Sequence, residues 1–145
     1  MHRWIVLSAL MLAVACRSPL LDGPEVLAVS DQSGTVFELR GLERRDLEAL
    51  REAAWSVERW EKLWRIHDPD APAPADASIA DVPTLAGAYV VTDRGVVFAP
   101  TATLKRGTVY DWYFFPSEMP VPPGESESRL SWRRSEFIGA SVAVP

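Results

Sequence analysis

The chain has 145 residues, enough for one domain, and 48% of them are hydrophobic, which excludes an intrinsically disordered protein because such chains cannot form a core. One cysteine, Cys16, excludes a disulfide-stapled miniprotein, and two histidines are too few for a histidine-based metal site. The net charge of −5 argues against a nucleic acid partner.

The amino terminus has the layout of a secretory signal peptide. Residues 1–3 include Arg3 and form a short basic region, residues 4–12 are apolar apart from Ser8, and residues 13–15 are Ala-Val-Ala. The uncharged stretch 4–15 is shorter than the roughly twenty residues that a transmembrane helix needs. We therefore predict that residues 1–15 are a signal peptide that is removed on export.

The only cysteine follows this leader directly. Residues 12–16, Leu-Ala-Val-Ala-Cys, resemble the lipobox of bacterial lipoproteins, although Ala13 stands where that family most often has leucine. The resemblance implies that Cys16 is acylated and anchors the protein in a membrane, with Arg17 favouring the outer membrane. In the alternative, Ala13 and Ala15 mark an ordinary cleavage site and Cys16 is a free thiol.

After the predicted lipidated tether, residues 16–24, the domain 25–145 begins with two strands. Residues 25–29 and 35–40 have strand composition, and residues 31–34 between them, Asp-Gln-Ser-Gly, favour a turn. In the second strand Phe37 and Leu39 alternate with polar neighbours, which is typical of a strand with one buried face.

A pair of short helices is expected next, as an insertion over about 43–66. Leu47, Leu50 and Ala54 have helical spacing in residues 43–54, and Ser56 can cap the second helix. Trp60, Leu63 and Trp64 would form the apolar stripe of that helix and pack in the core.

The stretch 67–81 carries the residues that most invite a site. Residues 68–81 contain four aspartates and three prolines and are expected to form a loop of solvated charge, since their spacing lacks the pattern of a calcium loop. His67, just before it, is expected to be solvated or to lie at a helix C-terminus.

The second half of the chain predicts the remaining strands. Residues 87–92 and 96–99 form a hairpin around a tight turn, and a further strand runs to Phe115. Its residues Tyr110, Trp112 and Phe114 share one face, and Tyr113 and Phe115 share the other. Residues 116–128 are predicted to be a loop, and residues 131–133 and 138–144 to be terminal strands.

Three motifs in this half resemble the bacterial immunoglobulin-like domain of the S-layer and surface-protein type. They are Gly87-x-Tyr89, Val97-Phe98-x-Pro100 and Leu104-x-x-Gly107-Thr108-x-Tyr110, with Arg106 where that family commonly has proline. The resemblance implies a mainly β, Ig-like Greek-key sandwich used for display, spacing or adhesion. The third motif is also typical of a tyrosine corner, in which Tyr110 would donate a structural hydrogen bond, Gly107 would permit the bend and Leu104 would fill the core.

No catalytic motif is recognised in the sequence, and neither a metal nor a cofactor is expected. The leading hypothesis is a lipid-anchored cell-envelope protein with a non-catalytic binding or structural module, whose partner is another envelope protein. The alternatives are an accessory subunit of an exported enzyme or a carbohydrate-binding module. The candidate binding residues of that module are aromatic side chains that can stack on a sugar: Trp112, Tyr113, Phe115 and Trp132.

Overall fold

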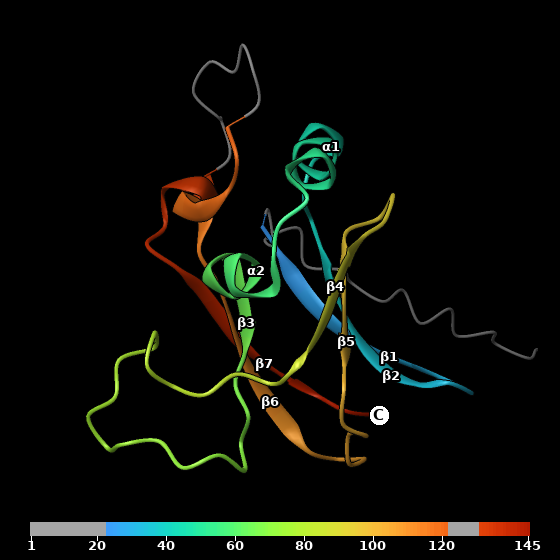
Figure 1. The fold of residues 1–145 in the computed structure, drawn as a ribbon, viewed down its shortest axis with the longest axis vertical. Helices are drawn as coiled ribbons and strands as arrows, with labels where there is room; N and C mark the ends of the chain where they lie inside the picture. The colour runs from blue at the N-terminus through green and yellow to red at the C-terminus, as the bar shows by residue number, and fades with distance from the viewer. Residues whose placement is uncertain (1–22, 122–130) are drawn as a thin grey trace, which may run out of the picture.

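The structure, a computed structural model, describes residues 23–121 and 131–145. The predicted leader 1–15, Cys16, the tether as far as residue 22 and most of the predicted loop 116–128 therefore lie outside the described residues. Seven antiparallel strands form two sheets, with orders β1-β2-β5-β4 and β3-β6-β7 (Figure 1). The strands are β1 (Glu25–Asp31), β2 (Gly34–Arg40), β3 (Trp64–Ile66), β4 (Gly87–Val91), β5 (Val96–Pro100), β6 (Val109–Phe114) and β7 (Ile138–Ala143).

The first hairpin confirms the two predicted strands and the turn between them. Asp31 closes the turn, since its carboxylate accepts hydrogen bonds from the backbone and hydroxyl of Ser33 at 2.7 and 2.5 Å. Phe37 and Leu39 are fully buried, as their alternation predicts. Glu38, on the opposite face of β2, is also buried, and its carboxylate accepts a 2.8 Å bond from Arg40.

Two helices connect the sheets, α1 (Arg44–Ala53) and α2 (Val57–Leu63). Gly41 makes the exit from β2 possible, because it has φ 92° and a Cβ there would lie 2.5 Å from the carbonyl oxygen of Gly23. The cap predicted at Ser56 is confirmed: its hydroxyl accepts from the Arg59 amide at 3.4 Å.

The predicted end of the second helix is wrong. Leu63 is the last helical residue, and Trp64 begins β3, whose three residues pair with β6. The spacing of Trp60, Leu63 and Trp64 is that of a helix, but the backbone of Trp64 is extended and pairs with Phe114 of β6. All three side chains are nevertheless buried, as expected of a core stripe.

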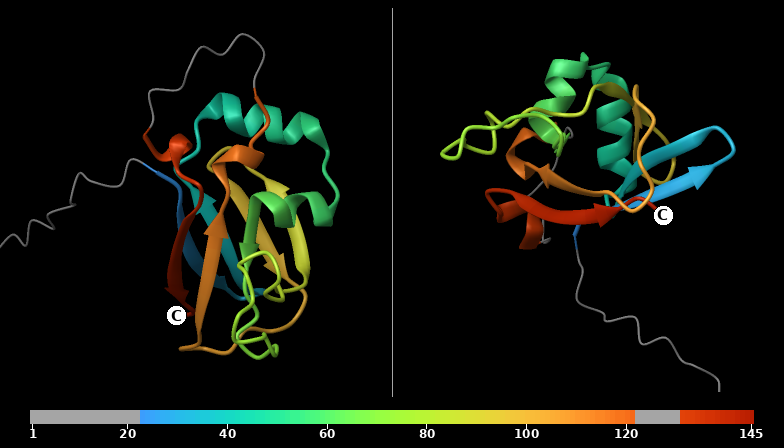
Figure 2. Two further views of the ribbon diagram at one scale, coloured as in Figure 1. Left: turned by 90° about the vertical axis from the view of Figure 1, so that its left-hand side faces the viewer. Right: turned by 90° about the horizontal axis from the view of Figure 1, so that it is seen from below.

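The loop between β3 and β4 leaves the sandwich and returns to the same place. His67 forms a bridge with Thr84, and the Leu85 amide donates to the Ile66 carbonyl at 2.9 Å. The end of β3 is therefore covered by the segment that leads into β4, which limits the open edge between the two sheets. Figure 2 shows this loop at the end of the sandwich opposite α1.

The carboxyl-terminal part gives one confirmed strand and one correction. β7 lies within the predicted strand 138–144 and pairs with β6 along its whole length. Residues 131–133, predicted as a strand, lie instead in a 3-10 helix, η2 (Ser131–Arg134). Trp132 is buried there against Phe114 and Gly23, so a compact turn places its ring where an extended strand would not.

One hydrophobic core joins both sheets and both helices. Its largest fully buried side chains come from β2, β3, β5 and β6: Trp64, Phe37, Phe98 and Phe114. No helix within the described residues is both long and apolar enough to span a bilayer.

Candidate functional site

The four predicted stacking residues separate into two pairs. Trp112 and Trp132 are buried in the core, 3% and 6% exposed, so they do not form a binding surface. Tyr113 and Phe115 lie on the opposite side of the β6 chain and are half-buried. The alternation along β6 predicts this division for Trp112 and Tyr113, because neighbouring side chains of a strand point to opposite faces.

A row of rings covers the outer face of the three-stranded sheet. The ring centroids of Tyr113 lie 4.7 Å from His67 and 5.7 Å from Phe137, and Phe137 lies 6.4 Å from Phe115. Phe137 is 41% exposed. We call His67, Tyr113, Phe115 and Phe137 the aromatic face. Sequence reasoning did not single out Phe137, and it expected His67 to be solvated or at a helix C-terminus. Both come from distant segments that only the sheet brings beside Tyr113.

Tyr113 lies close against the backbone of β7. Its register partner there is Gly139, and a Cβ on that glycine would lie 2.8 Å from Cδ1 of the tyrosine ring. Glycine thus leaves the space in which the ring packs against the strand.

Arg65 fixes one border of the aromatic face. Its guanidinium donates to the carbonyl oxygens of Glu61 at 3.1 Å and Ile79 at 2.8 Å, and lies 5.9 Å from the ring of Phe115. The second bond holds the loop after β3 beside the sheet. The charge of Arg65 is therefore oriented by backbone acceptors at the border of the face.

His67 occupies a different environment from the solvated one predicted. Its side chain is half-buried, its amide donates to the Asp111 carbonyl at 2.9 Å, and Nε2 is buried without a hydrogen-bond partner among the described residues. Burial lowers the pKa of His67, the charge of Arg65 lowers it further, and the carboxylate of Asp111 opposes both. The imidazole is therefore mainly uncharged at pH 7. Because the unfolded chain binds this proton more readily than the folded one, the free energy of unfolding falls as the pH drops through the lowered pKa.

Two polar side chains continue the same face below Tyr113. Asp111 and Ser141 are opposite each other on β6 and β7, and the serine hydroxyl donates to the carboxylate at 2.5 Å. Both are exposed. The outer face therefore combines aromatic rings with hydrogen-bonding groups, the combination by which proteins bind amphipathic ligands.

The residues of the predicted tyrosine corner occupy the expected places in part. Gly107 has φ 79°, Leu104 packs on the core, and Tyr110 is buried with its ring 5.4 Å from Phe37. Burial raises the pKa of Tyr110, and the charges of Asp70 and Asp68 raise it further. Within the described residues its hydroxyl makes no hydrogen bond.

Another tyrosine makes the buried hydroxyl bond. Tyr89 donates from its hydroxyl to the Trp64 carbonyl at 2.9 Å, and so joins β4 to β3 across the core. Burial is the main cause that raises the pKa of Tyr89 far above its ordinary value, and the charge of Glu61 adds to it. This tyrosine is structural, because its oxygen faces a backbone carbonyl in the interior.

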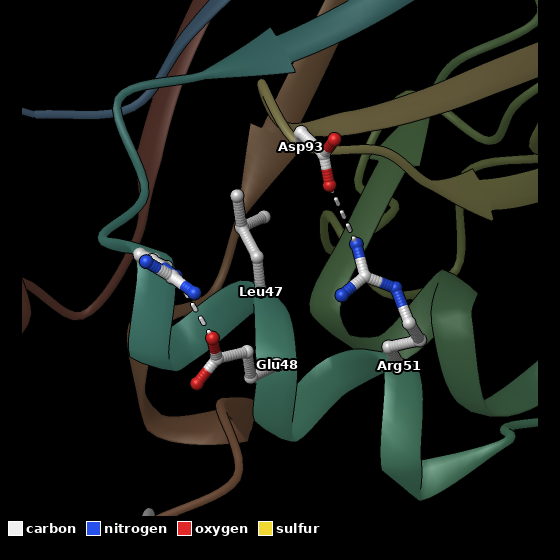
Figure 3. A pocket seen from close by; sticks show the side chains of 5 residues that line it. Leu47, Glu48, Arg51 and Asp93 are labelled. Atoms are coloured by element: carbon white, nitrogen blue, oxygen red, sulfur yellow. Dashed lines mark hydrogen bonds and ion pairs between the residues drawn. The ribbon is translucent and has the colours of Figure 1, made fainter.

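One hollow beside α1 is lined mainly by charged side chains. It has a volume of about 380 Å³ and lies between α1 and the β4–β5 turn, and its charged groups already pair with each other (Figure 3). Arg44 bonds Glu48 at 2.9 Å and Arg51 reaches Asp93 at 3.4 Å. Exposed pairs of this kind contribute little energy, so this hollow by itself does not indicate a ligand.

Two of the four aspartates in the loop after β3 accept hydrogen bonds within local turns. Asp68 accepts from the Asp70 amide at 3.0 Å, and Asp81 accepts from the Ser78 hydroxyl at 2.6 Å. Across residues 23–121 and 131–145 no three histidine, cysteine or acidic side chains converge as metal ligands would.

Comparison with known proteins adds no family. No family model, curated protein or solved structure matches the chain.

Proposed function

We propose that this chain is a lipid-anchored cell-envelope protein whose domain binds a partner, without catalysis, through the aromatic face. The observation that carries the proposal is the contiguous row of rings on the outer side of the three-stranded sheet, with Phe137 at its exposed border. Soluble domains rarely leave contiguous apolar surface open unless it serves as an interaction site.

The domain is proposed to be Ig-like. In the constant-type immunoglobulin sandwich, strands A, B, E and D form one sheet and C, F and G the other. The order β1-β2-β5-β4 beside β3-β6-β7 is the same when the seven strands are lettered in chain order. Trp64, buried on β3, also corresponds to the tryptophan that antibody domains bury on strand C. The helices α1 and α2 then occupy the connection between B and C.

The proposed anchor gives the domain an orientation. Seven residues, 17–23, separate Cys16 from Pro24, and they span at most about 25 Å when extended. Gly23 lies against Gly41 and Trp132, near the start of α1. The α1 end is therefore proposed to face the membrane, and the loop between β3 and β4 to point away from it.

The anchor is tested by the intact mass of the protein from separated membrane and soluble fractions. We expect a membrane-bound chain that begins at Cys16 and carries the mass of acyl chains, since two or more chains give stable binding. A Cys16→Ser variant should move to the soluble fraction. An unmodified chain beginning at Cys16 in the soluble fraction would contradict the anchor.

The partner proposed first is another envelope protein. A photo-crosslinking residue placed at Phe137 should give one discrete adduct in intact cells, and the adduct should disappear when Tyr113→Ala is added. The same residue placed at Val29, exposed on the other sheet, is the control. Equal labelling from both positions would count against the aromatic face.

A carbohydrate ligand is the second candidate, favoured by one observation. Tyr113 packs against Gly139 with Asp111 and Ser141 beside it, so a sugar could contact both a ring and hydrogen-bonding groups. Calorimetry with envelope polysaccharides should show binding that Tyr113→Ala weakens at least tenfold and Val29→Ala, on the other sheet, leaves unchanged. Tryptophan fluorescence is a poor readout here, because Trp112 and Trp132 are buried.

A further inference from the structure

A second hollow lies on the other sheet, where the junction of α1 and α2 meets the free edge of β4. Its volume is about 350 Å³, within the range of small ligand sites. Val90 lines it and is 57% exposed. The other two β4 residues of the lining, Tyr89 and Val91, are half-buried. The complete lining is Leu50, Arg51, Ala54, Trp55, Trp60, Tyr89, Val90 and Val91.

The wall of this hollow is built from rings that hold each other in place. Trp60 stacks on Tyr89, with centroids 5.4 Å apart and planes 8° apart, and Trp55 meets Trp60 edge-on at 5.2 Å. The guanidinium of Arg59 lies 4.3 Å from the centre of the Trp55 ring. Arg59 also donates to the carboxylate of Glu118 at 2.6 Å, so this pair connects the wall to η1 (Pro116–Glu118).

Beside the hollow, β4 offers unpaired backbone groups. The Thr92 amide donates to the Gly95 carbonyl, and the Thr101 amide donates to the Ala86 carbonyl, both at 2.8 Å. An antiparallel ladder alternates between bonded and non-bonded pairs, so Ala88 and Val90 direct their backbone groups at β5.

The β4 residues that alternate with Ala88 and Val90 direct their backbone groups to the opposite side of the strand. Gly87, Tyr89 and Val91 direct their N–H and C=O groups away from β5, and no described residue bonds to these groups. Such an edge is a template for another strand.

We propose that this edge binds an extended peptide by strand addition, with one aliphatic side chain of the peptide in the hollow. The backbone groups of Tyr89 and Val91 would supply the hydrogen bonds, and the ring wall would select the side chain. Backbone groups at strand spacing beside a pocket for one side chain suit an extended polypeptide, because its own N–H and C=O groups recur at the same interval.

The charge beside the hollow specifies the peptide further. Arg51 lines it, and among the residues that the structure describes its guanidinium pairs with one carboxylate, that of the fully exposed Asp93, 3.4 Å away. An acidic residue of the peptide can replace that weak partner, so the preferred ligand is an extended segment with an aliphatic residue and a nearby carboxylate. This site is independent of the aromatic face, which lies on the other sheet.

The test is selection from a displayed library of random decapeptides on the full chain as the cell makes it. Enriched peptides should alternate an aliphatic position with polar or acidic ones. Their binding should weaken at least tenfold when alternate peptide amides are N-methylated, and at least tenfold with Val91→Pro, which removes an outward N–H that β5 does not use.

Two further variants keep the test decisive. Val109→Pro is the matched control, since Val109 is the first residue of β6, is 53% exposed and lies on the other sheet; it should leave binding unchanged. Trp55→Ala removes one wall of the hollow and should also weaken peptide binding. It replaces Val91→Pro as the test if that variant does not fold. The proposal is overturned if no peptide is enriched, if binding survives both changes, or if a second copy of the chain occupies the edge as a dimer that Val91→Pro disrupts.

Discussion

Asp46 is a fully buried carboxylate in the first turn of α1, and its partner comes from the other end of the chain. One guanidinium nitrogen of Arg133 donates to its two oxygens at 2.6 and 2.5 Å. The side chain of Arg133 is only 15% exposed. The pair therefore joins η2 to α1 inside the protein, where a lone charge would be costly.

We expect Asp46→Ala to lower the free energy of unfolding by about 3–5 kcal/mol, because it leaves the guanidinium of Arg133 buried without this carboxylate. Urea denaturation measures the loss. The control is Glu48→Ala, which removes the surface pair with Arg44 and should cost about 0.5 kcal/mol or less. Similar losses in the two variants would show that the buried pair has no special weight.

Tyr89 predicts a dependence of stability on alkaline pH. Its raised pKa means that the unfolded chain releases this proton at about pH 10 while the folded chain still retains it. Stability should therefore fall as the pH rises above about 10, through the interval up to the folded pKa. In Tyr89→Phe this component disappears, so the decline should be shallower.

The same variant should cost about 1 kcal/mol at pH 7, because the Trp64 carbonyl loses its 2.9 Å bond. Tyr110, whose pKa is also raised, is present in both proteins, so the comparison isolates Tyr89. Urea midpoints at pH 7, 10 and 11 provide the measurement, and parallel curves for the two proteins would contradict the assignment.

At the scale of elements, the end of α1 has an alanine in a conformation that favours glycine. Ala54 has φ 47° and ψ 51°, the left-handed region in which a Cβ is strained, and it directs the chain into α2. The preceding residue, Ala53, is still helical.

These neighbours should respond in opposite directions to the same substitution. Ala54→Gly is expected to raise the free energy of unfolding by about 0.5–1 kcal/mol, since relief of strain exceeds the added freedom of the unfolded chain. Ala53→Gly should lower it by about 1 kcal/mol, the usual cost of glycine within a helix. Thermal and urea midpoints suffice, and a loss in both variants would contradict the strained cap.

At the scale of the whole molecule, helices and sheets share one core. Trp60 from α2 stacks on Tyr89 of β4, and Trp64 of β3 meets Phe98 of β5 at 6.3 Å. The bridge between His67 and Thr84 then closes the loop that separates β3 from β4. No described part of the chain has a core of its own.

The domain should consequently unfold in a single transition. We expect the urea curves from tryptophan fluorescence and from far-ultraviolet circular dichroism to share one midpoint, because the tryptophans report the core and the dichroism reports all elements. Loss of the helical signal at lower urea, with the fluorescence unchanged, would mean that α1 and α2 are a separate unit.

The amino-acid sequence by itself determined most of the elements. Alternation placed Phe37 and Leu39 inside and divided Trp112 from Tyr113, since the period of a strand is a local property of the chain. Ser56 and the turn at Asp31 were predictable for the same reason, because their hydrogen bonds join residues two or three positions apart. The leader and Cys16 also rest on local pattern, and they remain predictions.

Only the tertiary structure decided which distant residues meet. Trp64 follows its helix with the same apolar spacing, yet pairing with β6 makes it a strand residue. Trp132 suited a binding surface by type, yet η2 turns it into the core. The aromatic face unites Tyr113 with His67 and Phe137, and the ion pair unites Asp46 with Arg133 across 87 positions. These contacts follow from the packing of two sheets, and no local pattern in one sequence encodes the register that brings them together.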